Sequence, residues 1–241
     1  MKTKIIITSF IALSLYTLLY AAPKQSDVLN ELTTEITESI EQQIPTYTAN
    51  DLFEAVGRGD YQAVELIVNS KQVDIDSPHV YDEQTALMYA SWLGYLEIAD
   101  FLISKGANVN AVDHFLYTPL KLAIKYEHKE IVDLLIKNDA IIEDYYLLLA
   151  VHIGNSDIVD LLLENVSNVS SYDLLKEAIH SNYNECDTKV AKVLIKHGVN
   201  TEGALEWAKK WKCRKIIKLL ENEPSVLGPV QGVVSQGQIE K

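Results

Sequence analysis

Apolar and polar positions alternate with a helical period over residues 85–104, in two short blocks. Leu87, Ala90 and Leu93 fall on one face of a first helix, which ends at Gly94 because a residue without Cβ suits the left-handed conformation of a helix C-terminus. Apolar residues from 98 to 103 form the face of a second helix, which ends at Gly106. Helices this short are marginal in water, so the pair needs neighbours.

The helix pair is repeated in the sequence. The segment TPLKLA at 118–123 repeats TALMYA at 85–90 after 33 positions, and IVDLL at 131–135 repeats IADFL at 98–102. The period, these motifs and the segment GANVNA at 106–111 resemble the ankyrin repeat. The resemblance implies an all-α solenoid of stacked helix-turn-helix units with short fingers, acting as a protein-binding module.

The flanking units keep two helices but change the spacing. The connection at 74–84 carries two extra residues, whereas six residues are missing around 143–146, which predicts a clipped finger. The helix pairs expected outside the two regular repeats are 51–60 with 61–69, 147–153 with 157–164, 172–181 with 188–197, and 204–211 with 214–220. The repeat domain is thus predicted to span 47–222 in about five to six units, with the lysines of the last pair forming a polar cap.

Residues 1–22 have a different pattern. Lys2 and Lys4 precede an apolar run from 5 to 19, and small residues follow it. This is the layout of a secretory signal peptide, for which we expect cleavage after Ala21. An uncleaved membrane anchor is the alternative, although the run is short for a bilayer span. Both interpretations place the repeats outside the cytoplasm, periplasmic or secreted, and the chain resembles the exported ankyrin-repeat proteins of bacteria.

Two further segments flank the repeats. Residues 26–43 predict an amphipathic helix that carries five acidic residues and no basic one. We interpret residues 23–46 as this acidic helix and a linker, which either packs on the first repeat or binds a partner, a second copy included. Residues 223–241 lack periodicity and contain two prolines and a glycine within six residues, which predicts a disordered tail.

Charge and motifs narrow the function. A net charge of −13 disfavours nucleic-acid binding, and membrane contact beyond the N-terminal segment, because phosphate backbones and anionic bilayers repel it. The sequence has no phosphate loop, H-E-x-x-H or G-x-S-x-G motif, so we expect no catalysis, cofactor or metal. His152 and His180 hold equivalent positions but lack a third ligand, so we interpret them as surface histidines. Cys186 and Cys213 lie on the same edge of adjacent repeats, and form a candidate disulfide in an oxidising compartment.

The ankyrin resemblance also implies a concave face, built from the fingers and from exposed positions of each first helix. Matching by motif assigns to it the partner-binding residues Tyr81, Asp82, Gln84, Trp92, Leu93, His114, Phe115, Tyr117, Lys125 and Tyr126. Aromatic side chains are enriched at interfaces, although several of these could instead fold over the clipped finger and pack. Tyr145 and Tyr146 are expected to pack. We predict a non-catalytic protein–protein interaction module, with a secreted effector acting on host proteins as the alternative.

Overall fold

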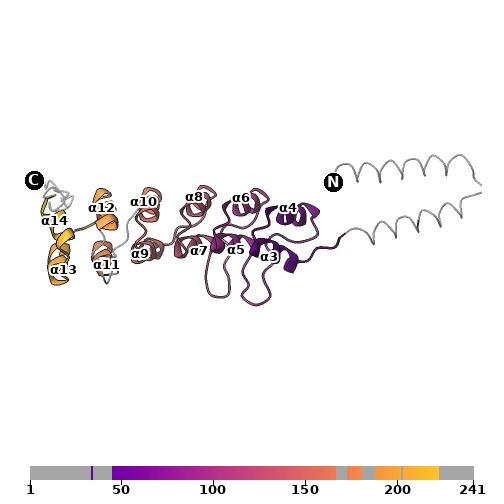
Figure 1. Cartoon of the computed structure of the whole chain (residues 1–241), viewed down its shortest axis with the longest axis horizontal. Coiled ribbons are helices and arrows are strands. Elements are labelled where there is room, and N and C mark those ends of the chain that lie inside the picture. The colour runs from indigo at the N-terminus through magenta and orange to yellow at the C-terminus, as the bar shows by residue number, and fades with distance from the viewer. Residues whose placement is uncertain (1–33, 35–44, 167–172, 181–187, 202, 223–241) are drawn as a thin grey trace, which may run out of the picture. The chain divides into compact units, whose positions relative to one another are not determined.

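A computed structural model describes residues 34, 45–166, 173–180, 188–201 and 203–222 (Figure 1). The predicted signal peptide, the predicted tail and nearly all of the acidic helix lie outside these residues. The described helices are α3 (Ala49–Gly57), α4 (Tyr61–Ser70), α5 (Ala86–Leu93), α6 (Leu96–Ser104), α7 (Pro119–Lys125), α8 (Lys129–Lys137), α9 (Asp144–Ile153), α10 (Ser156–Asn165), α11 (Leu174–His180), α12 (Thr188–Lys196), α13 (Ala204–Lys210) and α14 (Arg214–Asn222).

These helices form six consecutive pairs that stack in two layers. The first helices of the pairs contact one another in chain order from α3 to α13, and the second helices do the same from α4 to α14 (Figure 1). No strand occurs within the described ranges. The predicted all-α solenoid of helix-turn-helix units is therefore confirmed.

Threonine caps begin the first helices of three pairs. The hydroxyl oxygens of Thr48, Thr85 and Thr118 accept hydrogen bonds from backbone N–H groups three residues later, at 3.3, 3.3 and 3.1 Å. Each bond satisfies one of the N–H groups that a helix start leaves unpaired. Pro119 follows the third cap, where its missing N–H costs nothing. The recurring threonine of the sequence motif is thus a helix-start signal.

Gly94 fits the end of α5 for two reasons. Its φ of 81° is in the left-handed region, as the sequence predicted. A Cβ at this position would also lie 2.5 Å from the imidazole of His128, which belongs to the next repeat. That imidazole forms a 2.9 Å hydrogen bond with the backbone oxygen of Trp92. The glycine therefore allows the third repeat to cap the helix of the second.

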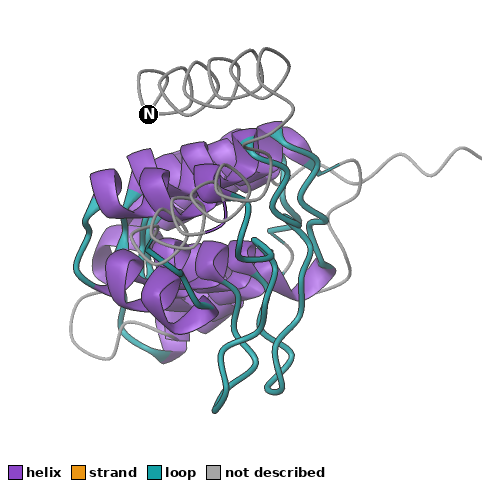
Figure 2. Cartoon of the chain, turned by 90° about the vertical axis from the view of Figure 1, so that its right-hand side faces the viewer, coloured by secondary structure: helices purple, strands orange, loops and turns teal. Residues whose placement is uncertain are grey.

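Two long connections project beside the layer of first helices. We call residues 71–85, between α4 and α5, finger 1, and residues 105–118, between α6 and α7, finger 2. Figure 2 shows both as loops that extend beyond the helices on the same side. The next connection, between α8 and α9, is short, as the missing residues predicted. The fingers therefore mark the second and third repeats as the distinctive part of the stack.

Tyr146 occupies the place that a clipped finger leaves. Its side chain is fully buried, and its hydroxyl forms a 2.8 Å hydrogen bond with the Thr118 hydroxyl of the preceding repeat. Burial raises the pKa of this phenol well above its usual value, although the Thr118 bond opposes the shift. Helix α9 begins at Asp144, three residues before the predicted start, because this tyrosine is part of the helix and fills the core.

The cysteine pair and the apolar helices bear on the remaining predictions. Cys213 is buried and has no free thiol, while Cys186 lies outside the described residues, so the bond between them stays a prediction. Within the described part of the chain, no helix is long and apolar enough to cross a bilayer.

Candidate functional site

Finger 1 closes into a tight turn that exposes its tip. The backbone N–H of His79 donates to the Gln84 oxygen at 2.8 Å, and the N–H of Glu83 donates back to the His79 oxygen at 3.0 Å. Glu83 turns the chain with a φ of 58°. The tip residues Val80 and Tyr81 are 86% and 89% exposed. Two large apolar side chains thus stand in solvent on an ordered turn.

A polar cluster fixes this turn to α5. The carboxylate of Asp82 lies 2.8 Å from the His79 ring nitrogen Nδ1, and it accepts the Gln84 N–H at 3.2 Å and the Tyr89 hydroxyl at 3.4 Å. Burial, followed by the Asp82 charge, raises the pKa of the Tyr89 phenol, which therefore remains a donor. The His79 ring also packs against Phe53 with centroids 4.9 Å apart. Asp82 therefore holds the finger in place.

Finger 2 is organised around one buried carboxylate. Asp113 is 4% exposed, and its Oδ1 accepts the backbone N–H groups of Phe115 and Tyr117, both at 2.8 Å. The Asp113 N–H donates to the Tyr117 oxygen at 3.1 Å and closes the turn. The turn leaves Phe115 and Leu116 61% and 72% exposed. Finger 2 thus repeats the design of finger 1, with a different aspartate.

The two fingers are joined to each other. The Gln84 amide of finger 1 donates to the other oxygen of Asp113 at 3.0 Å, and the Asn108 N–H donates to Asp76 at 2.9 Å. The buried Oε1 of Gln84 has no hydrogen-bond partner among the described residues. Because one buried carboxylate serves both loops, the two tips are held as one surface.

Aromatic rings continue from the fingers along α5 and α7. The Tyr89 ring lies 5.8 Å from Trp92, and Trp92 lies 6.0 Å from Tyr126 of the next repeat. Trp92 and Tyr126 are 38% and 42% exposed. Edge-to-face and tilted contacts at such distances stabilise aromatic pairs. The row therefore crosses from one repeat to the next while part of each ring remains in solvent.

Two lysines of α7 lie against a single tyrosine. The ammonium nitrogens of Lys121 and Lys125 are 4.3 and 4.8 Å from the centroid of the Tyr117 ring. Lys121 donates to the Leu116 oxygen at 3.2 Å, and Lys125 to the Tyr117 hydroxyl at 3.1 Å. The hydrogen bond that Lys125 donates to the phenol oxygen raises the pKa of this lysine, which keeps it charged. Positive charge is thus concentrated at the base of finger 2.

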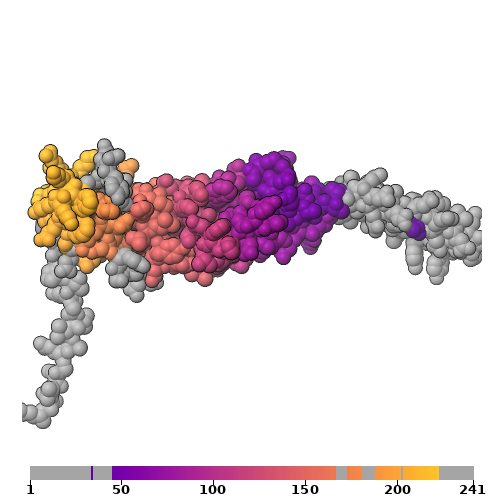
Figure 3. Space-filling model, turned by 90° about the horizontal axis from the view of Figure 1, so that it is seen from below, coloured from indigo at the N-terminus to yellow at the C-terminus, as the bar shows by residue number. Residues whose placement is uncertain are grey.

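The exposed residues of this region, with the half-buried Tyr117 and Lys121, form one surface, which includes six residues of the predicted concave face. We call it the finger face, and it consists of Val80, Tyr81, Trp92, Phe115, Leu116, Tyr117, Lys121, Lys125 and Tyr126. Figure 3 views the stack from the side of the first helices and fingers.

The ten residues predicted to bind a partner differ in their exposure and contacts in the structure. Six of them belong to the finger face, and His114 is exposed with its ring against Phe115. Asp82 and Gln84 instead hold the fingers through hydrogen bonds, and Leu93 is half-buried. The motif comparison overlooked Val80, Leu116 and Lys121, because matching to helical repeats does not say which loop residues a turn exposes. Of the three, Leu116 has a positive φ of 59°, a backbone conformation that a leucine in the sequence does not indicate.

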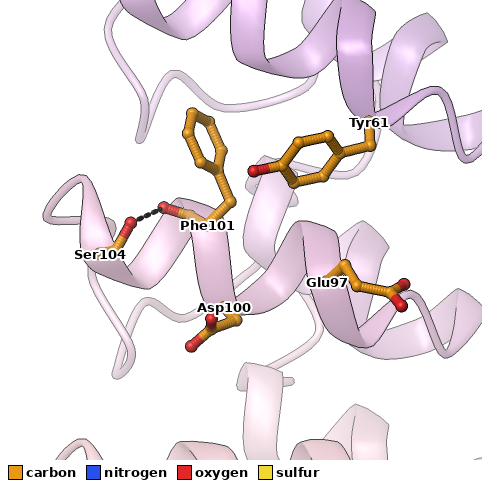
Figure 4. A pocket seen from close by; sticks show the side chains of 5 residues that line it. All are labelled: Tyr61, Glu97, Asp100, Phe101 and Ser104. Atoms are coloured by element: carbon orange, nitrogen blue, oxygen red, sulfur yellow. Dashed lines mark hydrogen bonds between the residues drawn. The ribbon is translucent and has the colours of Figure 1, made fainter.

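A hollow lies on the layer of second helices, between α4 and α6. Tyr61 and Phe101 meet there edge to face with centroids 5.5 Å apart, and Ser104 donates to the Phe101 oxygen at 2.7 Å. Figure 4 shows the carboxylates of Glu97 and Asp100 pointing away from the two rings. Its polar and aromatic groups therefore do not converge on one ligand position.

His152 and His180, the two histidines at equivalent positions, each contact another side chain. His152 Nδ1 lies 2.8 Å from the Glu177 carboxylate, and the His180 ring packs against Trp211 with centroids 5.3 Å apart. Within the described residues, no group of three or more His, Cys, Asp or Glu is placed to hold a metal ion.

Comparison with known proteins agrees with this architecture. A family profile described as "Ankyrin repeats (3 copies)" matches residues 18–113 and 52–146, which together cover more than half of the 241-residue chain. The chain is also similar to ankyrin repeat domain-containing protein 29 of Danio rerio, with 40% identity over 65 residues. That match covers 27% of this chain and only 22% of the relative.

Proposed function

Since the chain belongs to the ankyrin-repeat family, whose members are generally protein–protein interaction modules, we propose that it binds a partner protein through the finger face. The observation that carries the proposal is the exposure of large apolar side chains on a surface that buried hydrogen bonds hold in shape. Phe115, Leu116 and Tyr81 are more than half exposed, although burying each would be favourable. Exposed apolar surface of this kind marks interaction sites.

The fixed geometry of the fingers supports binding with little ordering cost. The Asp113 carboxylate and the His79–Asp82 contact hold both tips before any partner arrives. A loop already in its bound shape loses less conformational entropy on association, so more of the contact energy appears as affinity. Tryptophan and tyrosine are also the side chains most often found at binding hot spots. Trp92 at the middle of the row is the expected anchor.

The proposed mechanism is binding alone. The family is generally non-catalytic, and the finger face offers aromatic rings and lysines rather than an activated nucleophile. Occupancy by mass action would hold, block or recruit the partner.

We further propose that binding takes place outside the cytoplasm. The basic start and apolar run of residues 1–22 support export, by cleavage or with the segment retained as an anchor. N-terminal sequencing of the protein from its native cells distinguishes the two, because a chain that begins at Ala22 has been cleaved. If the chain leaves the cell and captures host proteins, it acts as an effector; capture of proteins from its own compartment supports an accessory role.

The test replaces both Trp92 and Phe115 by alanine and measures capture of proteins from the native compartment. We expect the affinity for each captured partner to fall by at least about 30-fold, the loss typical of one hot-spot residue. Tyr61→Ala is the matched control, because it removes a partly exposed aromatic ring from the opposite layer. Equal capture by the wild type and the Trp92/Phe115 variant, with an unchanged helical spectrum, would contradict the proposal.

A further inference from the structure

We propose that the finger face binds an acidic linear segment of the partner protein, and that Lys121 and Lys125 receive its carboxylates beside Tyr117. The inference rests on the proposed function and specifies the chemistry of what is bound. It begins with the charge of the chain, which has 34 acidic and 21 basic residues. Two ammonium groups directed at one ring are a local exception to that balance.

The charge of the two lysines is not paired with a carboxylate in the way that the charges of Lys137 and Lys196 are. Lys137 pairs with Asp133 at 2.6 Å, and Lys196 pairs with Asp160 at 3.0 Å. Among the described residues, neither Lys121 nor Lys125 has such an ion pair, and their hydrogen bonds go to neutral oxygens. Their positive charge is therefore available to a ligand.

Within the part of the chain that the structure describes, the two ammonium groups also use only part of their hydrogen-bond capacity. An ammonium group has three donors. One bond from Lys121 goes to the Leu116 oxygen, and one bond from Lys125 goes to the Tyr117 hydroxyl. These bonds and the Tyr117 ring fix where the nitrogens lie, so a carboxylate loses little to side-chain ordering when it binds there.

Apolar side chains surround the charged position. Lys125 is 5.6 Å from the centroid of Tyr126, which lies beside Trp92, and Lys121 is 5.1 Å from that of Tyr145. Phe115 and Leu116 stand exposed on the finger just before Tyr117. The segment that fits therefore carries Asp or Glu with a bulky aliphatic or aromatic residue a few positions away.

A peptide suits this surface better than a nucleic acid. The net charge of −13 repels a dense phosphate backbone over long range, whereas one or two carboxylates meet much weaker repulsion. The exposed apolar tips also have counterparts in peptide side chains. Because the two lysines are a local positive charge on an acidic protein, they would favour peptides with one or two acidic residues among apolar ones.

The test selects peptides from a displayed library of random linear sequences on the immobilised full chain. We expect Asp and Glu to be enriched in the recovered peptides, together with aromatic or aliphatic residues. A synthetic copy of the most enriched peptide then serves as a fluorescent probe for affinity. Replacing both lysines, Lys121→Gln with Lys125→Gln, is expected to weaken its binding about tenfold.

The control is Lys105→Gln. Lys105 is the first residue of finger 2, but its ammonium lies 5.2 Å from the ring centroid of Phe101 in α6, a helix of the second layer. It is expected to leave probe binding unchanged. One outcome would overturn this inference and leave the proposed function intact. In it, the selected peptides lack acidic residues, bind the Lys121→Gln/Lys125→Gln variant as tightly as the wild type, and lose affinity when Trp92 is replaced. Peptides that bind equally to the Trp92/Phe115 variant would overturn the proposed function. The immobilised chain is also offered soluble copies of itself. If it captures these copies and no acidic peptide, a second copy occupies the finger face and the proposal of an acidic segment is refuted.

Discussion

Replacing Asp113 by alanine should loosen finger 2 while leaving the helices formed. The change removes an acceptor that two backbone N–H groups share at 2.8 Å and that the Gln84 amide contacts at 3.0 Å. Hydrogen bonds to a charged group contribute about 1.5–3 kcal/mol each, and water can reach part of this site. We therefore expect a loss of about 3 kcal/mol in the free energy of unfolding. For a chain of this size the melting temperature would fall by about 6–12 °C.

The assay combines thermal unfolding with amide hydrogen exchange. Exchange at the N–H groups of Phe115 and Tyr117 reports the finger directly, because both are protected by the Asp113 carboxylate. Asp76→Ala is the matched control: it removes a carboxylate that accepts the Asn108 N–H at 2.9 Å in an exposed position. Its expected cost is about 1 kcal/mol or less.

The same variant also tests whether finger order matters for binding. Asp113→Ala keeps every side chain of the finger face, so weaker capture of a partner would come from lost pre-organisation. If Asp113→Ala and Asp76→Ala are equally stable, and exchange at Tyr117 is unchanged, the carboxylate does not organise the finger and the reasoning fails.

Three other changes test the fold more locally. Gly94→Ala should lower the free energy of unfolding by about 1 kcal/mol more than Gly106→Ala. Both glycines have a positive φ, but only at Gly94 would a Cβ meet a histidine ring of the next repeat; denaturant unfolding of the two variants measures the difference. Hydrogen bonds from His197, which follows α12, and from Lys196 at the end of that helix lower the pKa of Asp160. Their stabilising contribution is therefore present above the unfolded-state pKa of 3.8 and is lost as the pH falls through the lower folded-state pKa. Asp160→Asn should therefore flatten that acid-side decline in melting temperature. Alkylation of the unfolded protein should modify Cys186 and Cys213 only after reduction, and modification without reductant would exclude the bond.

The helices of the stack were predictable because their signals are local. Thr85 and Thr118 mark the starts of α5 and α7 because their hydroxyl groups cap the first backbone N–H groups. Gly94 marks the end of α5 because its backbone is left-handed. The clipped finger was also visible as missing residues. The start of α9 was placed too late, since only the three-dimensional contact between Tyr146 and Thr118 shows that the tyrosine belongs to the helix.

The proposed binding surface was less predictable than the helices, because fingers lack a periodic pattern. The motif comparison assigned Trp92, Phe115 and Tyr126 to the partner-binding face, and all three are exposed. It could not separate Asp82, which holds a turn, from Tyr81, which stands in solvent beside it. Neighbouring loop residues differ in this way because a tight turn directs each side chain separately, and no spacing rule encodes the direction.

The irregularity of the fingers is what gives the second and third repeats a surface of their own. Turn chemistry, with Glu83 and Leu116 at positive φ, extends apolar tips that a short connection such as that before α9 cannot provide. Gln84 then makes the two tips dependent on one another through Asp113. A change in the conformation of one finger should therefore alter how a partner binds the other. The effects of substitutions on the two fingers on the binding free energy should then be non-additive. Independent effects of tip substitutions at Tyr81 and Phe115 would show instead that the fingers act as separate loops.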